Sequence, residues 1–254
     1  MSKMRIALTA EDMIMAVIAR SNRLHDQGQS ASDLGVEARR VLGLVDGRIR
    51  DLICNLARSA NYLEVGSCCG ATAVAASTNG IGKYWSIDIF SEWHLVKDLL
   101  MTGLPVLGDF EEIRHLTMQQ ANEYHCKKFG SKYQLIVQDS MAVDLPKLLG
   151  SEKLDVFYYD GDHGQDPTRD NIIKYSAHFA DQCILLVDDF NDAGVQSGVR
   201  AALWNIPYHV IMQDIQPWWN GFAVIVLQRE ELATQEESQP VGLRADQAVS
   251  RREQ

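Results

Sequence analysis

The sequence lacks the features that mark several classes of protein. It has no run of five or more basic residues, and 24 Lys and Arg against 34 Asp and Glu give a formal net charge of -10. An acidic chain repels phosphate backbones and anionic lipid surfaces, so we expect neither nucleic acid nor a membrane as a partner. No stretch reaches the roughly 18 uncharged apolar residues that a membrane-spanning helix needs.

Cysteine is scarce and irregularly placed. The five cysteines are Cys54, Cys68, Cys69, Cys126 and Cys183. An odd number without regular spacing predicts neither a disulfide framework nor a zinc site. The N-terminal stretch carries Glu11 and Asp12 and lacks the long apolar region of a signal peptide. We therefore expect a cytoplasmic protein in a reducing environment.

The stretch Asn61 to Ser77, NYLEVGSCCGATAVAAS, organises the rest of the chain. It predicts a short buried strand at 62–65, a turn that contains Gly66 and Gly70, and the start of a helix. Such a turn leaves backbone N–H groups at the helix start, which suit a negative or polar group of a small ligand. The NAD fingerprint G-x-G-x-x-G is absent, because Cys68 occupies its second glycine position.

Strand and helix patterns alternate along the chain. Further strands are predicted at 83–88, 133–137, 154–160, 183–187, 208–215 and 222–228. Helices are predicted at 10–24 with Thr9 as N-cap, 36–58, 71–76, 93–101, 110–128, 141–149, 193–204, and 166–179 with Asp166 as N-cap and Pro167 as the first helical residue. Five strand–helix units and two closely connected strands predict an α/β, Rossmann-like sheet of seven strands. We expect it to be mostly parallel, with an antiparallel last strand, helices on both faces and extra N-terminal helices.

The domain organisation follows from these patterns. We expect N-terminal helices in 1–58, a main domain in 59–229 with an insertion at 91–131, and a polar, disordered tail in 230–254. Trp93, His94, His115 and His125 of the insertion could contact substrate or simply pack.

Acidic residues stand at the carboxyl ends of the predicted strands. Because the ends of parallel strands meet at one edge of a sheet, Glu64, Asp88 and Asp160 should line one crevice. Asp88 follows Gly66 by 22 residues and is placed to accept hydrogen bonds from ribose hydroxyls.

Asp160 and Asp188 end neighbouring predicted strands. Neighbouring strands lie about 4.8 Å apart. Two carboxylates this close repel each other, so either one keeps its proton or a cation lies between them. Asp189 adds a third carboxyl group, and no cysteine or histidine cluster accompanies the three. A ligand set of oxygens favours a hard ion such as Mg²⁺ over zinc.

The pattern E-x-G-x-x-x-G from Glu64 to Gly70 resembles motif I of class I S-adenosylmethionine (SAM)-dependent methyltransferases. Its G-S-C-C-G-A-T form is especially similar to small-molecule O-methyltransferases of the catechol type. The resemblance spans roughly residues 56–229 and implies SAM as cofactor. It places the cofactor-binding residues at Glu64, Gly66, Ser67, Cys68, Gly70, Thr72, Asp88, Asp139, Ser140 and Asp160, with the two after the third strand near the adenine.

The resemblance also implies a metal site and a base. Catechol-type enzymes hold Mg²⁺ with an aspartate after the fourth strand and an Asp-Asn pair after the fifth, which match Asp160, Asp188 and Asp189. This sequence departs from the catechol-type pattern at one of these positions, where Asp189 stands in place of the family's Asn. His163 stands where those enzymes have a lysine base, so we expect Asp160 and His163 to be the catalytic residues; a loop histidine hydrogen-bonded to Asp162 is the alternative. The D-G-D-H sequence also resembles bacterial methyltransferases that do not all use metal.

In the resembling family the N-terminal helices cover the cofactor or form a dimer contact. Trp218 and Trp219 should flank the crevice, where they suit either a planar substrate or a homodimer contact. We expect SAM-dependent methyl transfer to the hydroxyl of a small molecule, with Mg²⁺ and His163 assisting. The alternatives are a metal-independent N- or C-methyltransferase of a small metabolite, a non-catalytic SAM-binding partner subunit, and a polyamine-type aminopropyl transferase.

Overall fold

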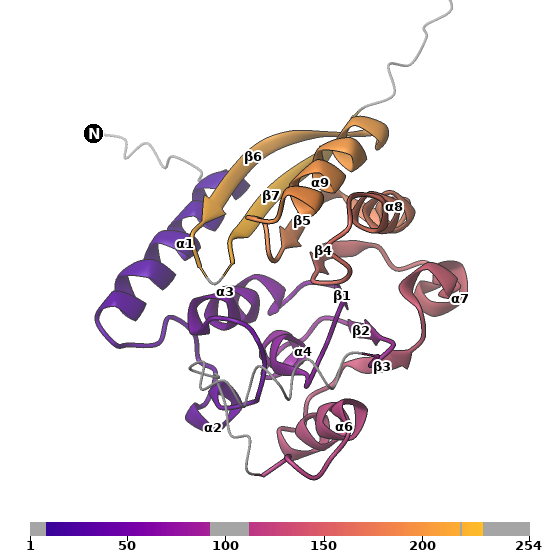
Figure 1. Ribbon diagram of the computed structural model, residues 1–254. Helices are drawn as coiled ribbons and strands as arrows, with labels where there is room; N and C mark the ends of the chain where they lie inside the picture. Colours follow the sequence, from indigo (N-terminus) through magenta and orange to yellow (C-terminus); the bar gives the residue numbers. More distant parts are fainter. Residues whose placement is uncertain (1–8, 92–111, 219, 231–254) are drawn as a thin grey trace, which may run out of the picture.

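A seven-stranded sheet forms the centre of the computed structural model, which describes residues 9–91, 112–218 and 220–230 (Figure 1). The strand order is β3-β2-β1-β4-β5-β7-β6, and β7 runs antiparallel to both of its neighbours. The strands are β1 Tyr62–Val65, β2 Tyr84–Asp88, β3 Gln134–Val137, β4 Leu154–Tyr159, β5 Phe179–Val187, β6 Tyr208–Gln216 and β7 Phe222–Arg229. The predicted fold class is confirmed.

The central strands are apolar because the sheet is covered on both faces. Alternate residues of one strand enter different cores: Tyr158 packs in one hydrophobic cluster, and Phe157 and Tyr159 pack in the other. The first cluster includes α1 Ala10–Asp26, α3 Gly47–Ala57 and α4 Ala71–Ser77. The second includes α7 Leu145–Leu149, α8 Gln165–Ser176 and α9 Ala193–Asn205. Within the described ranges, no helix is long and apolar enough to cross a membrane.

Local signals define several helix ends. Thr9 caps α1 through a capping box with Asp12, as predicted. The helix α6 Met118–Lys128 begins after Thr117, which forms a second capping box with Gln120. The predicted start of this helix at Phe110 is wrong, because the helix begins at Met118 and residues 112–116 form turns and a bend. The helix predicted at 93–101 and the tail lie outside the described residues.

The continuous helix predicted for 36–58 is also wrong. The chain forms α2 Val36–Arg39, leaves the helix, and forms α3 only after Asp46, whose carboxylate accepts a hydrogen bond from the backbone N–H of Arg48. Arg50 Nη1 donates to the carbonyls of Arg39 and Val41, both at 2.6 Å. Between α2 and α3 the backbone therefore has no continuous helical hydrogen bonding. The Asp46 side chain caps the start of α3, and the Arg50 side chain donates to carbonyls that a helix would have paired.

Three smaller boundaries differ from the sequence expectation. The helix predicted at 141–149 is a 3₁₀ turn, Ser140–Ala142, followed by α7, which Asp144 caps. Gly164, not Asp166, is the N-cap of α8, so Pro167 is the third residue of its first turn. This helix ends at Ser176 because Phe179 already begins β5, which is longer than predicted.

Trp218 belongs to the core instead of flanking the crevice. Its side chain is 1% exposed, and its ring stacks on Phe222 with centroids 6.0 Å apart. The indole Nε1 donates to Asn22 Oδ1 of α1 at 3.0 Å, and Asn22 Nδ2 donates to Gln216 Oε1 at 3.1 Å. Trp218 therefore fastens α1 to the end of the β6–β7 hairpin. The neighbouring Trp219 lies outside the described residues.

Asn22→Ala should lower the free energy of unfolding by about 1–3 kcal/mol, because it leaves the buried indole N–H without its acceptor. Urea denaturation measures this change. Arg20→Ala on the exposed face of the same helix is the control and should be near neutral. Equal stabilities of the Asn22 variant and the wild type would contradict the fastening role.

Candidate active site

The turn after β1 brings two parts of the site into contact. Gly66 has φ 89°, and a Cβ at this position would overlap the carbonyl oxygen of Asp160 at the end of β4. Gly70 has φ 88° and packs against Tyr133 and Asn122. Both positions require glycine, one for close approach and both for the left-handed backbone. Cys68 between them is also left-handed, with φ 49°.

Asp88 at the end of β2 holds the backbone of this turn. Its Oδ2 accepts hydrogen bonds from the backbone N–H groups of Ser67 and Cys68, both at 2.8 Å, and Oδ1 accepts from Phe90 N at 2.6 Å. The N–H groups of Ser67 and Cys68 are therefore paired within the chain, whereas the sequence expectation concerned the N–H groups at the start of α4. The carboxylate is partly exposed beside the turn, and ribose binding by Asp88 stays a prediction.

Glu64 lies beneath the turn and not at its surface. It is fully buried, and its two oxygens accept hydrogen bonds from the hydroxyls of Tyr62 and Ser86, both at 2.8 Å. Burial raises the pKa of the Glu64 carboxyl, and hydroxyl donors oppose that shift. Ser67 and Thr72 are also buried, with 2% and 3% exposure. These three predicted cofactor residues support the turn from inside.

Tyr158 joins the two acids that end β4 and β5. Its phenol O–H donates to Asp188 Oδ2 at 2.8 Å and lies 3.2 Å from Asp160 Oδ2. Burial and the neighbouring carboxylates raise the pKa of Asp160 well above its usual range, and burial raises that of Asp188 to about 7. The charge of Asp188 is the second cause, after burial, that raises the pKa of Asp160, which is the direction that the predicted repulsion requires.

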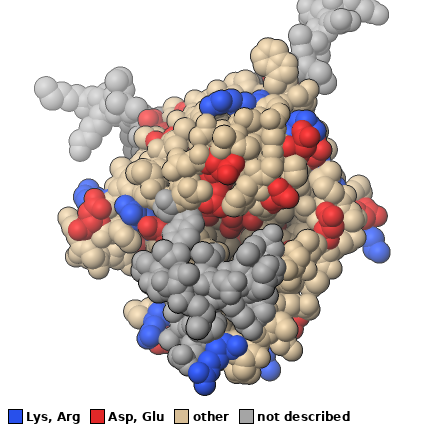
Figure 2. Space-filling view, in the orientation of Figure 1, with Lys and Arg blue, Asp and Glu red and all other residues tan. Residues whose placement is uncertain are grey.

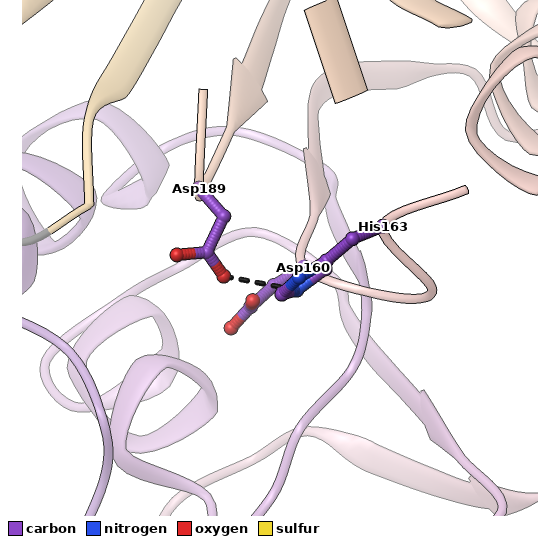
Figure 3. A group of neighbouring side chains, drawn as sticks. All are labelled: Asp160, His163 and Asp189. Carbon is purple, nitrogen blue, oxygen red and sulfur yellow. Dashed lines mark ion pairs between the residues drawn. The ribbon is translucent and has the colours of Figure 1, made fainter. Parts of the chain in front are cut away.

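Asp160, His163 and Asp189 point toward one another (Figure 3). His163 Nε2 lies 3.0 Å from Asp189 Oδ2, and one ligand atom from each of the three residues lies within 4.8 Å of the others. Asp188, a predicted metal ligand, is not in this group; its oxygens accept from the Tyr158 hydroxyl and from the backbone N–H of Asp189 at 2.9 Å. His163 lies in the group, and the metal ligands stay a prediction.

Backbone geometry directs these side chains. Asp189 has φ 50°, a conformation that Asp and Asn tolerate better than other residues with side chains. The loop that carries His163 is fixed by Tyr159, whose phenol donates to the Asp162 carbonyl at 2.7 Å. The Asp162 carboxylate accepts from Gly164 N at 2.7 Å, and the partner of His163 is Asp189.

The acidic surroundings favour the charged imidazole. The hydrogen bond to Asp189 is the main cause that raises the pKa of His163, and Asp192 and Asp162 add to it. The His163 side chain is 51% exposed, so solvent can reach it. Figure 2 shows acidic side chains gathered near the centre of this face.

Asp139 and Ser140 lie beyond the end of β3, two strands from β1. The Asp139 carboxylate accepts from Met141 N at 2.7 Å and caps the 3₁₀ turn. The Ser140 carbonyl accepts from Lys174 Nζ at 2.9 Å and from the Tyr175 hydroxyl at 3.0 Å. Both residues therefore form hydrogen bonds that stabilise this loop, and a contact of either residue with adenine stays a prediction.

A family of proteins described as "Methyltransferase domain" matches residues 63–190, about half of the chain. The chain belongs to this family. The matched stretch contains the glycine turn and both acid-bearing strand ends, so it covers the site described above. Membership implies SAM as the methyl donor.

Several solved structures have a fold similar to that of this methyltransferase. The SAM complex of the O-methyltransferase TomG from Streptomyces achromogenes, involved in tomaymycin synthesis, is 16% identical, with a TM-score of 0.50 and coverage of 90% of this chain and 94% of TomG. Cofactor-bound Rv0187 from MTB is 17% identical, with a TM-score of 0.50 and coverage of 89% and 94%. The chain spans only 50% of TrmN from Thermus thermophilus, which covers 74% of it at 15% identity and a TM-score of 0.48. No curated protein matches.

Sequence reasoning missed two parts of the methyltransferase site. Tyr158 looked like one residue of an apolar strand, although its position two residues before Asp160 on the same face could have indicated a donor to that acid. Asn122 of α6 contacts the glycine turn and stands in no pattern that marks such a role. His125, which we expected either to contact substrate or to pack, is buried, and its Nδ1 lies 2.8 Å from the Cys69 carbonyl oxygen.

Asp189→Asn should lower the pKa of His163 relative to the wild type, because it removes the charge that stabilises the imidazolium. An NMR pH titration of the imidazole measures this shift, with Asp166→Asn as a control that leaves it unchanged. Since folding raises the pKa of His163, the ion pair stabilises the fold below a pH of about 6.5, and this contribution is lost as the pH rises through the folded-state pKa. An unchanged pKa in the Asp189 variant would contradict the pairing.

Proposed function

We propose that this methyltransferase transfers the methyl group of SAM to a hydroxyl of a small-molecule acceptor, with His163 as general base. The observation that carries the proposal is the His163–Asp189 pair, at 3.0 Å, on the same sheet edge as the glycine turn. The turn and the end of β4 are in backbone contact, so a cofactor at the turn lies beside Asp160.

The reaction needs positioning and proton removal more than covalent assistance. The acceptor oxygen forms a bond to the methyl carbon, the carbon–sulfur bond breaks, and the electron pair moves to sulfur, which yields S-adenosylhomocysteine. The hydroxyl proton passes to the neutral imidazole of His163. Asp189 orients the ring through Nε2, leaves Nδ1 for the acceptor, and stabilises the imidazolium that forms.

The cofactor and metal parts of the proposal rest on the chemistry of the side chains present. Asp88 is a partly exposed carboxylate beside the turn, which suits ribose hydroxyls. Asp160 and Asp189 offer the oxygen ligands that Mg²⁺ prefers, with Asp188 as the further ligand proposed from the family resemblance. A bound divalent ion would lower the pKa of the acceptor hydroxyl.

A metal-independent methyltransferase, including one that acts on nitrogen or carbon, is the second candidate. It is favoured by the position of Asp188, whose oxygens both accept hydrogen bonds inside the protein. The net charge of -10 supports a small-molecule partner over nucleic acid in either case.

Calorimetric titration with S-adenosylhomocysteine tests the cofactor site first. We expect micromolar binding to the wild type and its loss in Asp88→Ala, with Glu37→Ala, an exposed acid on α2, as the control that binds normally. Absence of binding to the folded wild type would rule out the proposed function.

His163→Ala should lower kcat by about 10²–10⁴-fold, with little change in the KM for SAM, because it removes the base and not a cofactor contact. His209→Ala on β6, an exposed histidine outside the site, is the matched control. The wild-type rate should rise with pH as the imidazole loses its proton, with a midpoint above the ordinary histidine value. Wild-type kcat in the His163 variant would refute the base.

Chelation separates the two candidate functions. If Mg²⁺ binds at Asp160 and Asp189, EDTA should abolish methyl transfer, and added Mg²⁺ should restore it. Titration calorimetry with Mg²⁺ alone should then show binding that Asp160→Asn removes. Full activity in EDTA would favour the metal-independent reaction and leave the proposed role of His163 in place.

A further inference from the structure

The helix α6 contacts the carbonyl side of the glycine turn. Asn122 Nδ2 donates to Ser67 Oγ at 2.8 Å and to the Cys68 carbonyl at 3.2 Å. His125 Nδ1 lies 2.8 Å from the Cys69 carbonyl, which can only accept, so this nitrogen carries a proton. Three consecutive residues of the turn therefore have a hydrogen bond to one helix.

The two anchors are themselves held in place. Asn122 is fully buried, and its Oδ1 accepts from the Tyr133 hydroxyl at 2.7 Å. His125 is 3% exposed, and burial lowers its pKa. Buried side chains with satisfied polar atoms have little freedom to follow a displaced turn, so α6 resists such a displacement.

Asp88, at the end of β2, also holds the turn, through backbone N–H groups instead of carbonyls. This carboxylate binds the backbone N–H groups of Ser67 and Cys68, whereas Asn122 binds the Cys68 carbonyl. Cys68 thus has its N–H and its carbonyl fixed by different elements. Its φ of 49° is unfavourable for a residue with a side chain and persists only where the surroundings enforce it.

We propose that Asn122 is a positioning residue for the cofactor: it holds Cys68 in the left-handed conformation that the SAM-binding turn requires. This inference rests on the proposed function, in which the turn binds SAM. Asn122 is fully buried and contacts the turn through Ser67 and Cys68, so it acts on the affinity for SAM and S-adenosylhomocysteine. The methyl-transfer step at saturating SAM does not depend on it.

The test combines Asn122→Ala with Cys68→Gly. Asn122→Ala should raise the Kd for S-adenosylhomocysteine and the KM for SAM about tenfold, while kcat stays within about twofold of wild type. Glycine adopts a positive φ without support. In the double variant Cys68→Gly/Asn122→Ala the affinity should therefore return to that of Cys68→Gly alone.

Two measurements keep the outcome clear. Thermal melts of each variant confirm that it is folded at the assay temperature, and Gln119→Ala, which removes an exposed hydrogen bond to Glu123 on the same helix, should bind normally. Wild-type affinity in Asn122→Ala would overturn the positioning role. So would an affinity loss that Cys68→Gly does not relieve, because Asn122 would then act through general packing. No binding by the wild type would instead refute the proposed function.

Discussion

The site depends on one close approach, that of the backbone at Gly66 to the carbonyl of Asp160. No side chain fits between them, so the glycine turn after β1 and the acidic end of β4 remain in direct contact. This contact explains why residues separated by nearly a hundred positions form one site. It also explains why the turn needs a glycine here for reasons of space as well as of backbone conformation.

Beneath that edge of the sheet, tyrosine hydroxyls stabilise buried carboxylates by donating hydrogen bonds to them. Tyr62 and Tyr158 each precede an acid by two residues on the same strand face, and each donates its phenol hydrogen to a carboxylate. An unpaired carboxylate in this layer would cost several kcal/mol, so each such acid has a hydrogen-bond donor within the sheet. Burial and mutual repulsion then raise the pKa values of Asp160 and Asp188, so both acids favour the protonated form more than an ordinary aspartate does.

Sequence periodicity was enough for the architecture, because a strand buried on both faces has a visible apolar run and acids mark its end. The mostly parallel sheet with its antiparallel last strand, and the meeting of Asp160 with the Asp188–Asp189 pair at one edge, follow from that. Distances between side chains are beyond such patterns. Asp189 reaches His163 from a left-handed backbone conformation, and the break before Asp46 depends on Arg50. Asn122 acts across 54 residues on Cys68, which no local pattern indicates.

The link between Trp218 and Asn22 has a consequence for how the chain folds. The two residues are 196 positions apart, yet the indole, Phe222 and the apolar face of α1 share one cluster. During synthesis α1 emerges together with α3, the helix that it packs against, whereas the β6–β7 hairpin with Trp218 emerges much later. Contacts of such long sequence separation slow folding and expose apolar surface in the meantime. The hydrogen bond between Trp218 and Asn22 can therefore form only after the hairpin has been synthesised, so this fastening of α1 is a late step of folding.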